Sequence, residues 1–79
     1  MTAEVFRIKQ ELEKDENFRT IKNPEQFAEK IHSAYYNKLD PICEIRKASL
    51  WLMANPTRSK KNYSRFLANW FSNALRWRS

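Results

Sequence analysis

The 79-residue chain contains no glycine, one cysteine and one histidine. The absence of glycine excludes the Gly-rich loops that cradle phosphates in nucleotide-binding proteins, and it disfavours tight β-hairpins. A single cysteine, Cys43, excludes an internal disulfide and a four-thiolate zinc site. Cys43 and the one histidine, His32, fall in different predicted helices, so they do not by themselves make a metal site or a nucleophile–base pair. We expect a core thiol and a surface imidazole instead. We therefore predict a protein that is not an enzyme and that has no metal site or cofactor.

Long hydrophobic runs are also missing. No stretch approaches the roughly 18 apolar residues that a membrane-spanning helix requires. The first four residues, Met1-Thr2-Ala3-Glu4, do not begin an apolar run typical of a secretion signal. We therefore expect a cytoplasmic protein that does not associate with membranes.

Hydrophobic residues nevertheless make up 42% of the chain and aromatic residues 14%, which is sufficient for one small core. No segment shows the alternation of apolar and polar residues that is typical of a strand. We predict an all-α fold, a compact bundle of three to four short helices, as a single domain over residues 1–79. Residues 1–22 form a first helix and a connection, and residues 23–79 form the helical core.

The first helix is predicted from Ala3 to about Lys14, with Thr2 as its N-cap. The stretch from Asp15 to Lys22 is expected to be an irregular connection that places Phe18 and Ile21 in the core. The apolar stripe of this first helix comprises Val5, Ile8 and Leu12, with Phe6 beside them.

Two Pro-containing sequences predict the starts of the next helices. Asn23-Pro24 supplies a cap oxygen followed by a proline suited to the first turn, and Gln26 occupies the capping-box position. Asp40-Pro41 repeats this chemistry, and Asn55-Pro56 ends the third helix. The inward residues are predicted to be Phe27, Ile31, Ala34 and Tyr35, then Ile42, Ile45, Ala48, Trp51 and Leu52, with Glu44, Arg46 and Lys47 facing water.

The last helix has the strongest periodicity in the chain. It is predicted to begin at a cap provided by Thr57 or Ser59 and to run to about Trp77. Trp70 lies in the middle of its apolar stripe and is therefore expected in the core. The stripe comprises Tyr63, Phe66, Leu67, Trp70, Ala74 and Trp77, widened by Phe71 and Leu75.

The net charge of +6 is unevenly distributed. Residues 1–40 contain seven Lys/Arg and eight Asp/Glu, for a net charge of −1, whereas residues 41–79 contain eight Lys/Arg and one acid, for a net charge of +7. This asymmetry predicts an anionic partner, of which nucleic acid is the commonest. The alternative is a charged face that serves solubility alone.

The polar side of the last helix carries the candidate nucleic-acid-binding residues. Guanidinium and ammonium groups one turn apart suit successive phosphates, and amide groups suit phosphates or base edges. Arg58, Lys60 and Lys61 also crowd the predicted helix start, where the helix dipole favours an anion. The complete set is Arg58, Lys60, Lys61, Asn62, Arg65, Asn69, Arg76, Trp77 and Arg78.

Two binding modes follow from this pattern. The turn at residues 55–59 between two helices permits a helix-turn-helix, with the last helix in a major groove. Alternatively, Trp77, which is flanked by Arg76 and Arg78, stacks on the bases of a single strand.

The segment from about Tyr35 to Asn73 resembles a C-terminal helical segment of phage and prophage replication proteins, the replisome organisers and helicase-loader-like proteins. Most of the resemblance lies in the run WLMANPTRSKKNYSRFLANWF at residues 51–71. The last helix is also loosely similar to that of the primosomal DnaD-like family. The resemblance implies contact with DNA or with a replicative helicase through Lys60, Lys61, Asn62, Arg65 and Asn69, and a core of Trp51, Tyr63, Phe66, Leu67 and Trp70.

The chain departs from those proteins in its first part. It lacks their large N-terminal winged-helix region, and residues 1–34 have no counterpart there, which suggests a stand-alone product that uses the module differently. We expect a small phage-type accessory protein of DNA replication that binds nucleic acid through a basic C-terminal helix. The alternatives are a protein-binding module, such as a phage inhibitor docking on a host nucleic-acid enzyme, and a homo-oligomer that pairs through its aromatic stripe.

Overall fold

A computed structural model describes residues 2–55 and 62–78, with the backbone alone at residues 77 and 78. The described residues form four α-helices and one short 3₁₀-helix and contain no strand, which confirms the predicted all-α bundle. In chain order the elements are α1 (Ala3–Lys14), η1 (Phe18–Thr20), α2 (Pro24–Tyr35), α3 (Pro41–Ala54) and α4 (Tyr63–Arg78).

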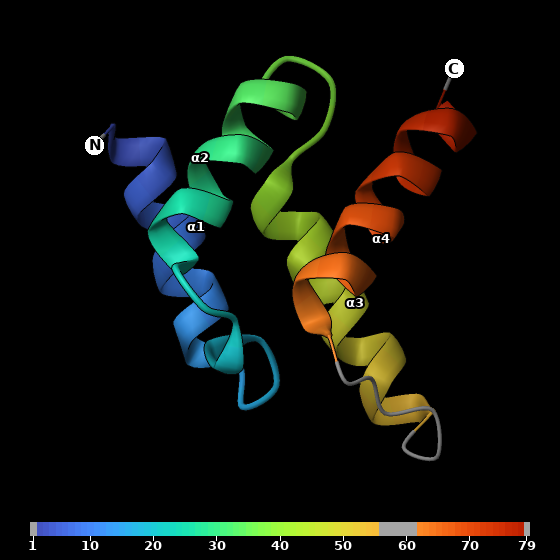
Figure 1. Cartoon of the computed structure of the whole chain (residues 1–79). Coiled ribbons are helices and arrows are strands. Elements are labelled where there is room, and N and C mark those ends of the chain that lie inside the picture. Colours follow the sequence, from blue (N-terminus) through green and yellow to red (C-terminus); the bar gives the residue numbers. More distant parts are fainter. Residues whose placement is uncertain (1, 56–61, 79) are drawn as a thin grey trace.

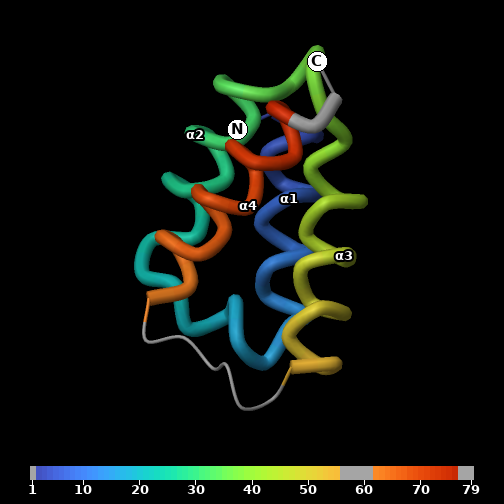
Figure 2. The backbone as a smooth tube through the Cα atoms, turned by 90° about the vertical axis from the view of Figure 1, so that its right-hand side faces the viewer, coloured from blue at the N-terminus to red at the C-terminus, as the bar shows by residue number. Residues whose placement is uncertain are grey.

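The helices pack in two layers. α1 and α2 form an antiparallel pair (Figure 1), and α3 lies on the side of α1 away from α2 (Figure 2). α4 lies in front of α1, between α2 and α3, when the molecule is viewed from the side (Figure 2). The start of α1 and the end of α4 lie at the end of the bundle where α2 connects to α3. The thinnest dimension, 16 Å between the outermost Cα atoms, fits two layers of helices packed about 10 Å apart.

Every helix contributes to one hydrophobic core. The predicted stripe of α1 is confirmed, and Phe18 and Ile21 of the connection are buried as expected. Phe6 does not join the stripe, because its side chain is 47% exposed on the outer side of α1. The largest fully buried side chains are Ile8, Leu12, Phe18, Ile45, Leu67 and Phe71.

Two of the predicted N-caps are confirmed. Thr2 Oγ1 accepts a hydrogen bond from the backbone N–H of Val5 at 3.2 Å, and Asp40 Oδ1 accepts one from that of Cys43 at 3.3 Å. Both bonds span three residues, so they depend only on the chain immediately around each helix start.

Asn23 is the N-cap residue of α2 as predicted, but the prediction that its side-chain oxygen caps the helix is wrong. Asn23 is in the left-handed region, with φ 53° and ψ 59°, and its side chain makes no capping hydrogen bond. Its backbone carbonyl instead accepts the N–H of Phe27 at 3.1 Å. Asparagine tolerates this conformation better than most residues, so Asn23 serves here to reverse the chain direction before α2.

The inward face of α2 is also rotated from the prediction. Ala28 and Ile31 are buried, whereas Phe27 and Tyr35 are half-buried and Ala34 is exposed. A small residue such as Ala28, which is fully buried, permits a close approach of neighbouring helices, whereas the ring of Tyr35 packs on Phe71 of α4. The sequence pattern favoured the large residues because it carries no information on interhelical distance.

Candidate nucleic-acid interface

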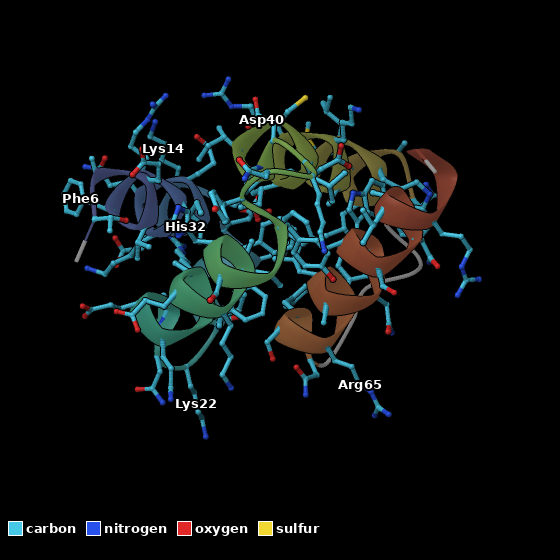
Figure 3. The ribbon with its side chains drawn as sticks, turned by 90° about the horizontal axis from the view of Figure 1, so that it is seen from above. Phe6, Lys14, Lys22, His32, Asp40 and Arg65 are labelled. Carbon is cyan, nitrogen blue, oxygen red and sulfur yellow. The ribbon has the colours of Figure 1, made fainter. Side chains whose placement is uncertain are left out.

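The outward face of α4 brings together three of the predicted contact residues. Arg65, Asn69 and Arg76 are all exposed, and so is Ser72 between the last two. Their spacings of four, three and four residues align them along one side of the helix. α4 contains no acidic residue, and Arg65 projects away from the bundle (Figure 3).

The length of this face is comparable with the width of a nucleic-acid groove. Arg65 and Arg76 are eleven residues apart in one helix, which corresponds to about 16 Å along its axis. The two guanidinium groups therefore bracket the hydroxyl and amide groups of Ser72 and Asn69. The major groove of B-DNA is about 12 Å wide and bordered by phosphates on both sides.

The opposite face of α4 is committed to the core. Leu67 and Phe71 are fully buried, and the Phe71 ring stacks on that of Tyr35 with centroids 5.3 Å apart. The rings of Phe66, Trp51 and Trp70 form a triangle, with centroid distances of 5.9 Å from Phe66 to Trp51, 6.0 Å from Phe66 to Trp70 and 6.5 Å between the two tryptophans. The stripe is therefore centred on Leu67 and Phe71, and Trp70, predicted at its middle, is half-buried at its edge.

Glu44 was predicted to face water, and this prediction is wrong. Its side chain is buried against α4, where Oε1 accepts a hydrogen bond from Trp70 Nε1 at 3.1 Å. Its second oxygen, Oε2, pairs with Lys47 Nζ at 3.4 Å. The carboxylate thus joins α3 to α4, and the indole of Trp70 is held by it rather than presented for base stacking.

Replacing Trp70 by phenylalanine should lower the free energy of unfolding by about 1–3 kcal/mol, because it leaves the Oε1 atom of the buried Glu44 carboxylate without its donor. Urea denaturation followed by circular dichroism measures the change. In a Glu44→Leu background the same replacement should cost clearly less. An equal cost in both backgrounds would show that the hydrogen bond does not stabilise the fold.

The start of α4 lies later in the chain than predicted. The helix begins at Tyr63, and Asn62 Oδ1 accepts the backbone N–H of Arg65 at 3.0 Å and the hydroxyl of Ser64 at 2.7 Å. Asn62 therefore acts as the cap, and its carbonyl oxygen is already engaged within the protein. Thr57 and Ser59, the predicted caps, lie outside the described residues, as do Arg58, Lys60, Lys61 and the side chains of Trp77 and Arg78.

The structure adds Lys22 to the neighbourhood of this helix start. Lys22 and Thr20 line a shallow hollow of about 300 Å³ together with Asn62 and Ser64. Lys22 and Arg65 project from the same edge of the molecule (Figure 3). Nothing in the local sequence could indicate this, since some 40 residues separate Lys22 from α4.

Cys43 is exposed on α3, so the prediction of a core thiol is wrong. Its position in the first turn of α3 points outward, and Ile45 and Ala48 form the inner side. His32 and Cys43 line one open pocket of about 590 Å³, but no hydrogen bond joins them. Among residues 2–55 and 62–78, no group of three or more His, Cys, Asp or Glu side chains is placed to hold a metal ion.

Comparisons with protein-family models, with curated proteins and with solved structures gave no match. The similarity to phage replication proteins therefore stays a prediction from the quoted residues. No helix in the described part of the chain has the length and apolarity to cross a membrane.

Proposed function

We propose that the chain is a cytoplasmic accessory protein of phage-type DNA replication that binds nucleic acid through the outward face of α4. The observation that carries the proposal is the alignment of Arg65, Asn69 and Arg76 on one exposed, acid-free helix face. Phosphate contacts supply most of the affinity in such complexes, and amide groups between them reach base edges.

Three further features support this function. The excess positive charge lies in residues 41–79, whose one acid, Glu44, lies on α3, where it pairs with Lys47, and not on α4. Lys22 adds a cation on the same edge as Arg65. The resemblance to replication proteins covers the same segment.

The geometry favours duplex DNA over a single strand. Single-strand binding by proteins of this size depends on exposed aromatic rings on which bases stack. The rings of Phe66, Trp70 and Phe71 pack into the bundle instead. A rigid helix with cations at both ends and small polar groups between them suits the major groove.

Fluorescence anisotropy with labelled duplex and single-stranded DNA, titrated across salt, tests the proposal. We expect binding to the duplex, with a slope of about −2 to −4 when the logarithm of the binding constant is plotted against the logarithm of the salt concentration. Such a slope corresponds to about two to four neutralised phosphates. Absence of binding at low salt would refute the function. A preference for the single strand would instead favour stacking by Trp77.

A further inference from the structure

A second surface, on the outer face of α3, carries exposed apolar residues. Leu50 is 64% exposed and Met53 is 74% exposed, the largest values among the exposed large hydrophobic residues of the described chain. They are three residues apart and so lie on the same side of the helix, with exposed Ala54 beside them. Clustered apolar side chains with a charged rim are typical of protein-interaction sites.

This face borders a recess between α1 and α3. A hollow of about 400 Å³ lies beside Leu50, with Ile45 and Ser49 in its lining. The recess is large enough for an apolar side chain of a partner. Met53 is exposed on the same face of α3, and its unbranched side chain is of a kind that adapts to varied surfaces. An exposed apolar helix face beside a groove is the arrangement that binds an amphipathic helix.

In the ion pairs around this face, the cationic side chains are exposed to solvent and the acidic side chains are covered. The side chains of Lys14, Arg46 and Lys47 are 71%, 65% and 59% exposed. The acids paired with them are covered, at 14% exposure for Glu11 and 9% for Glu44. Lys14 and Arg46 share Glu11, so these three cations and two acids carry a net charge of +1, and a partner approaching from solvent meets the cations first.

The arrangement of the acids supports this orientation. Glu11 accepts two hydrogen bonds from the Arg46 guanidinium, at 3.2 and 3.3 Å, and these bonds and its charge raise the pKa of Arg46. Asp15, at the edge of the hollow, accepts the backbone N–H groups of Asn17 and Phe18 at 2.8 and 3.1 Å and the hydroxyl of Ser49. Both carboxylates are thus satisfied within the protein.

We propose that the outer face of α3, together with the recess against α1, is a docking site for an acidic amphipathic helix of a partner protein. Apolar residues of that helix cover Leu50 and Met53, and its carboxylates pair with Lys14, Arg46 and Lys47. A second copy of the chain fits less well, because it would bring the same cations together over two large apolar side chains. A stable dimer commonly buries about 800 Å² on each partner, and two large apolar side chains supply only a small part of such an area.

This docking site is independent of the proposed nucleic-acid interface. Lys14 and Asp40 mark one edge of the molecule and Arg65 projects from the opposite edge (Figure 3). A helix bound on α3 therefore leaves the outward face of α4 accessible. The protein would hold a protein partner and a nucleic acid at the same time.

The experiment uses a synthetic peptide with a leucine stripe at helical spacing and glutamates on the remaining positions. Its binding is followed by amide chemical shifts in NMR spectra of the full chain and by anisotropy of the labelled peptide. We expect shifts confined to α3 and the facing side of α1. Leu50→Glu with Met53→Glu should weaken binding about tenfold or more. Lys14→Glu should weaken it in the same direction.

Matched variants separate this site from others. Tyr36→Ser removes a comparably exposed hydrophobic side chain elsewhere, and Arg65→Glu alters only the α4 face; neither should change peptide affinity. Circular dichroism confirms the helical content of each variant. Arg65 belongs to the proposed DNA-binding face, and Leu50 and Met53 belong to the docking face. Failure of the docking site can therefore be distinguished from failure of the proposed DNA binding.

Four outcomes would overturn the docking site. These are no binding of the acidic peptide, equal binding of a peptide in which lysine replaces glutamate, affinity unchanged by the Leu50 and Met53 substitutions, and shifts outside α1 and α3. Dimerisation of the wild-type chain that Leu50→Glu abolishes would assign the face to a second copy. Binding to phosphatidylserine vesicles but not to the peptide would assign it to a membrane surface.

Discussion

Replacing Phe71 by alanine is expected to lower the free energy of unfolding by about 3–5 kcal/mol. Phe71 is fully buried, and its ring stacks on Tyr35 of α2, so its loss leaves a cavity where α4 meets the rest of the bundle. A domain of this length has a total stability of roughly 4–12 kcal/mol. The variant should therefore be largely unfolded at room temperature or have a greatly reduced urea midpoint in circular dichroism.

The neighbouring Ser72 provides the control, because it is exposed on the same helix. Ser72→Ala should change the stability by no more than about 0.5 kcal/mol. If Phe71→Ala were equally mild, α4 would not be part of the cooperative core. The outward orientation of Arg65 and Arg76 would then lose its structural basis.

Reversing both arginines of the α4 face, Arg65→Glu with Arg76→Glu, is expected to abolish binding to duplex DNA. Each substitution replaces an attractive phosphate contact by a repulsive one, and removal of one contact reduces the salt slope by about one. Both positions are exposed, so the circular-dichroism spectrum should be unchanged. Anisotropy at low salt, where binding is strongest, gives the most stringent measurement.

The control variant changes the net charge by the same amount, but on another surface of the protein. Arg7→Glu with Lys30→Glu also lowers the net charge from +6 to +2, since each reversal removes two charges, and both residues are exposed on α1 and α2. This variant should retain most of the affinity. Equal loss in both variants would mean that binding depends on total charge and not on the α4 face.

Local sequence determined most of the helix limits, with the start of α4 as the exception. The limits of α1, the caps at Thr2 and Asp40 and the end of α3 at Ala54 agree with the prediction. Each depends on contacts within about one helical turn. An example is the hydrogen bond that a backbone N–H donates to the side-chain oxygen of the residue three positions earlier. The basic face of α4 was predictable for the same reason, because residues at helical spacing share a side whatever the partner helix.

Tertiary packing decided which of these faces are covered. The burial of Glu44, the half-burial of Trp70 and the proximity of Lys22 to α4 depend on residues more than twenty positions away. The exposure of Cys43, Leu50 and Met53 follows from the direction in which α1 and α4 approach α3. Periodicity identifies an apolar side of a helix but carries no information on how many helices cover it. The candidate nucleic-acid face could therefore be predicted from sequence, whereas the docking face on α3 required the assembled bundle.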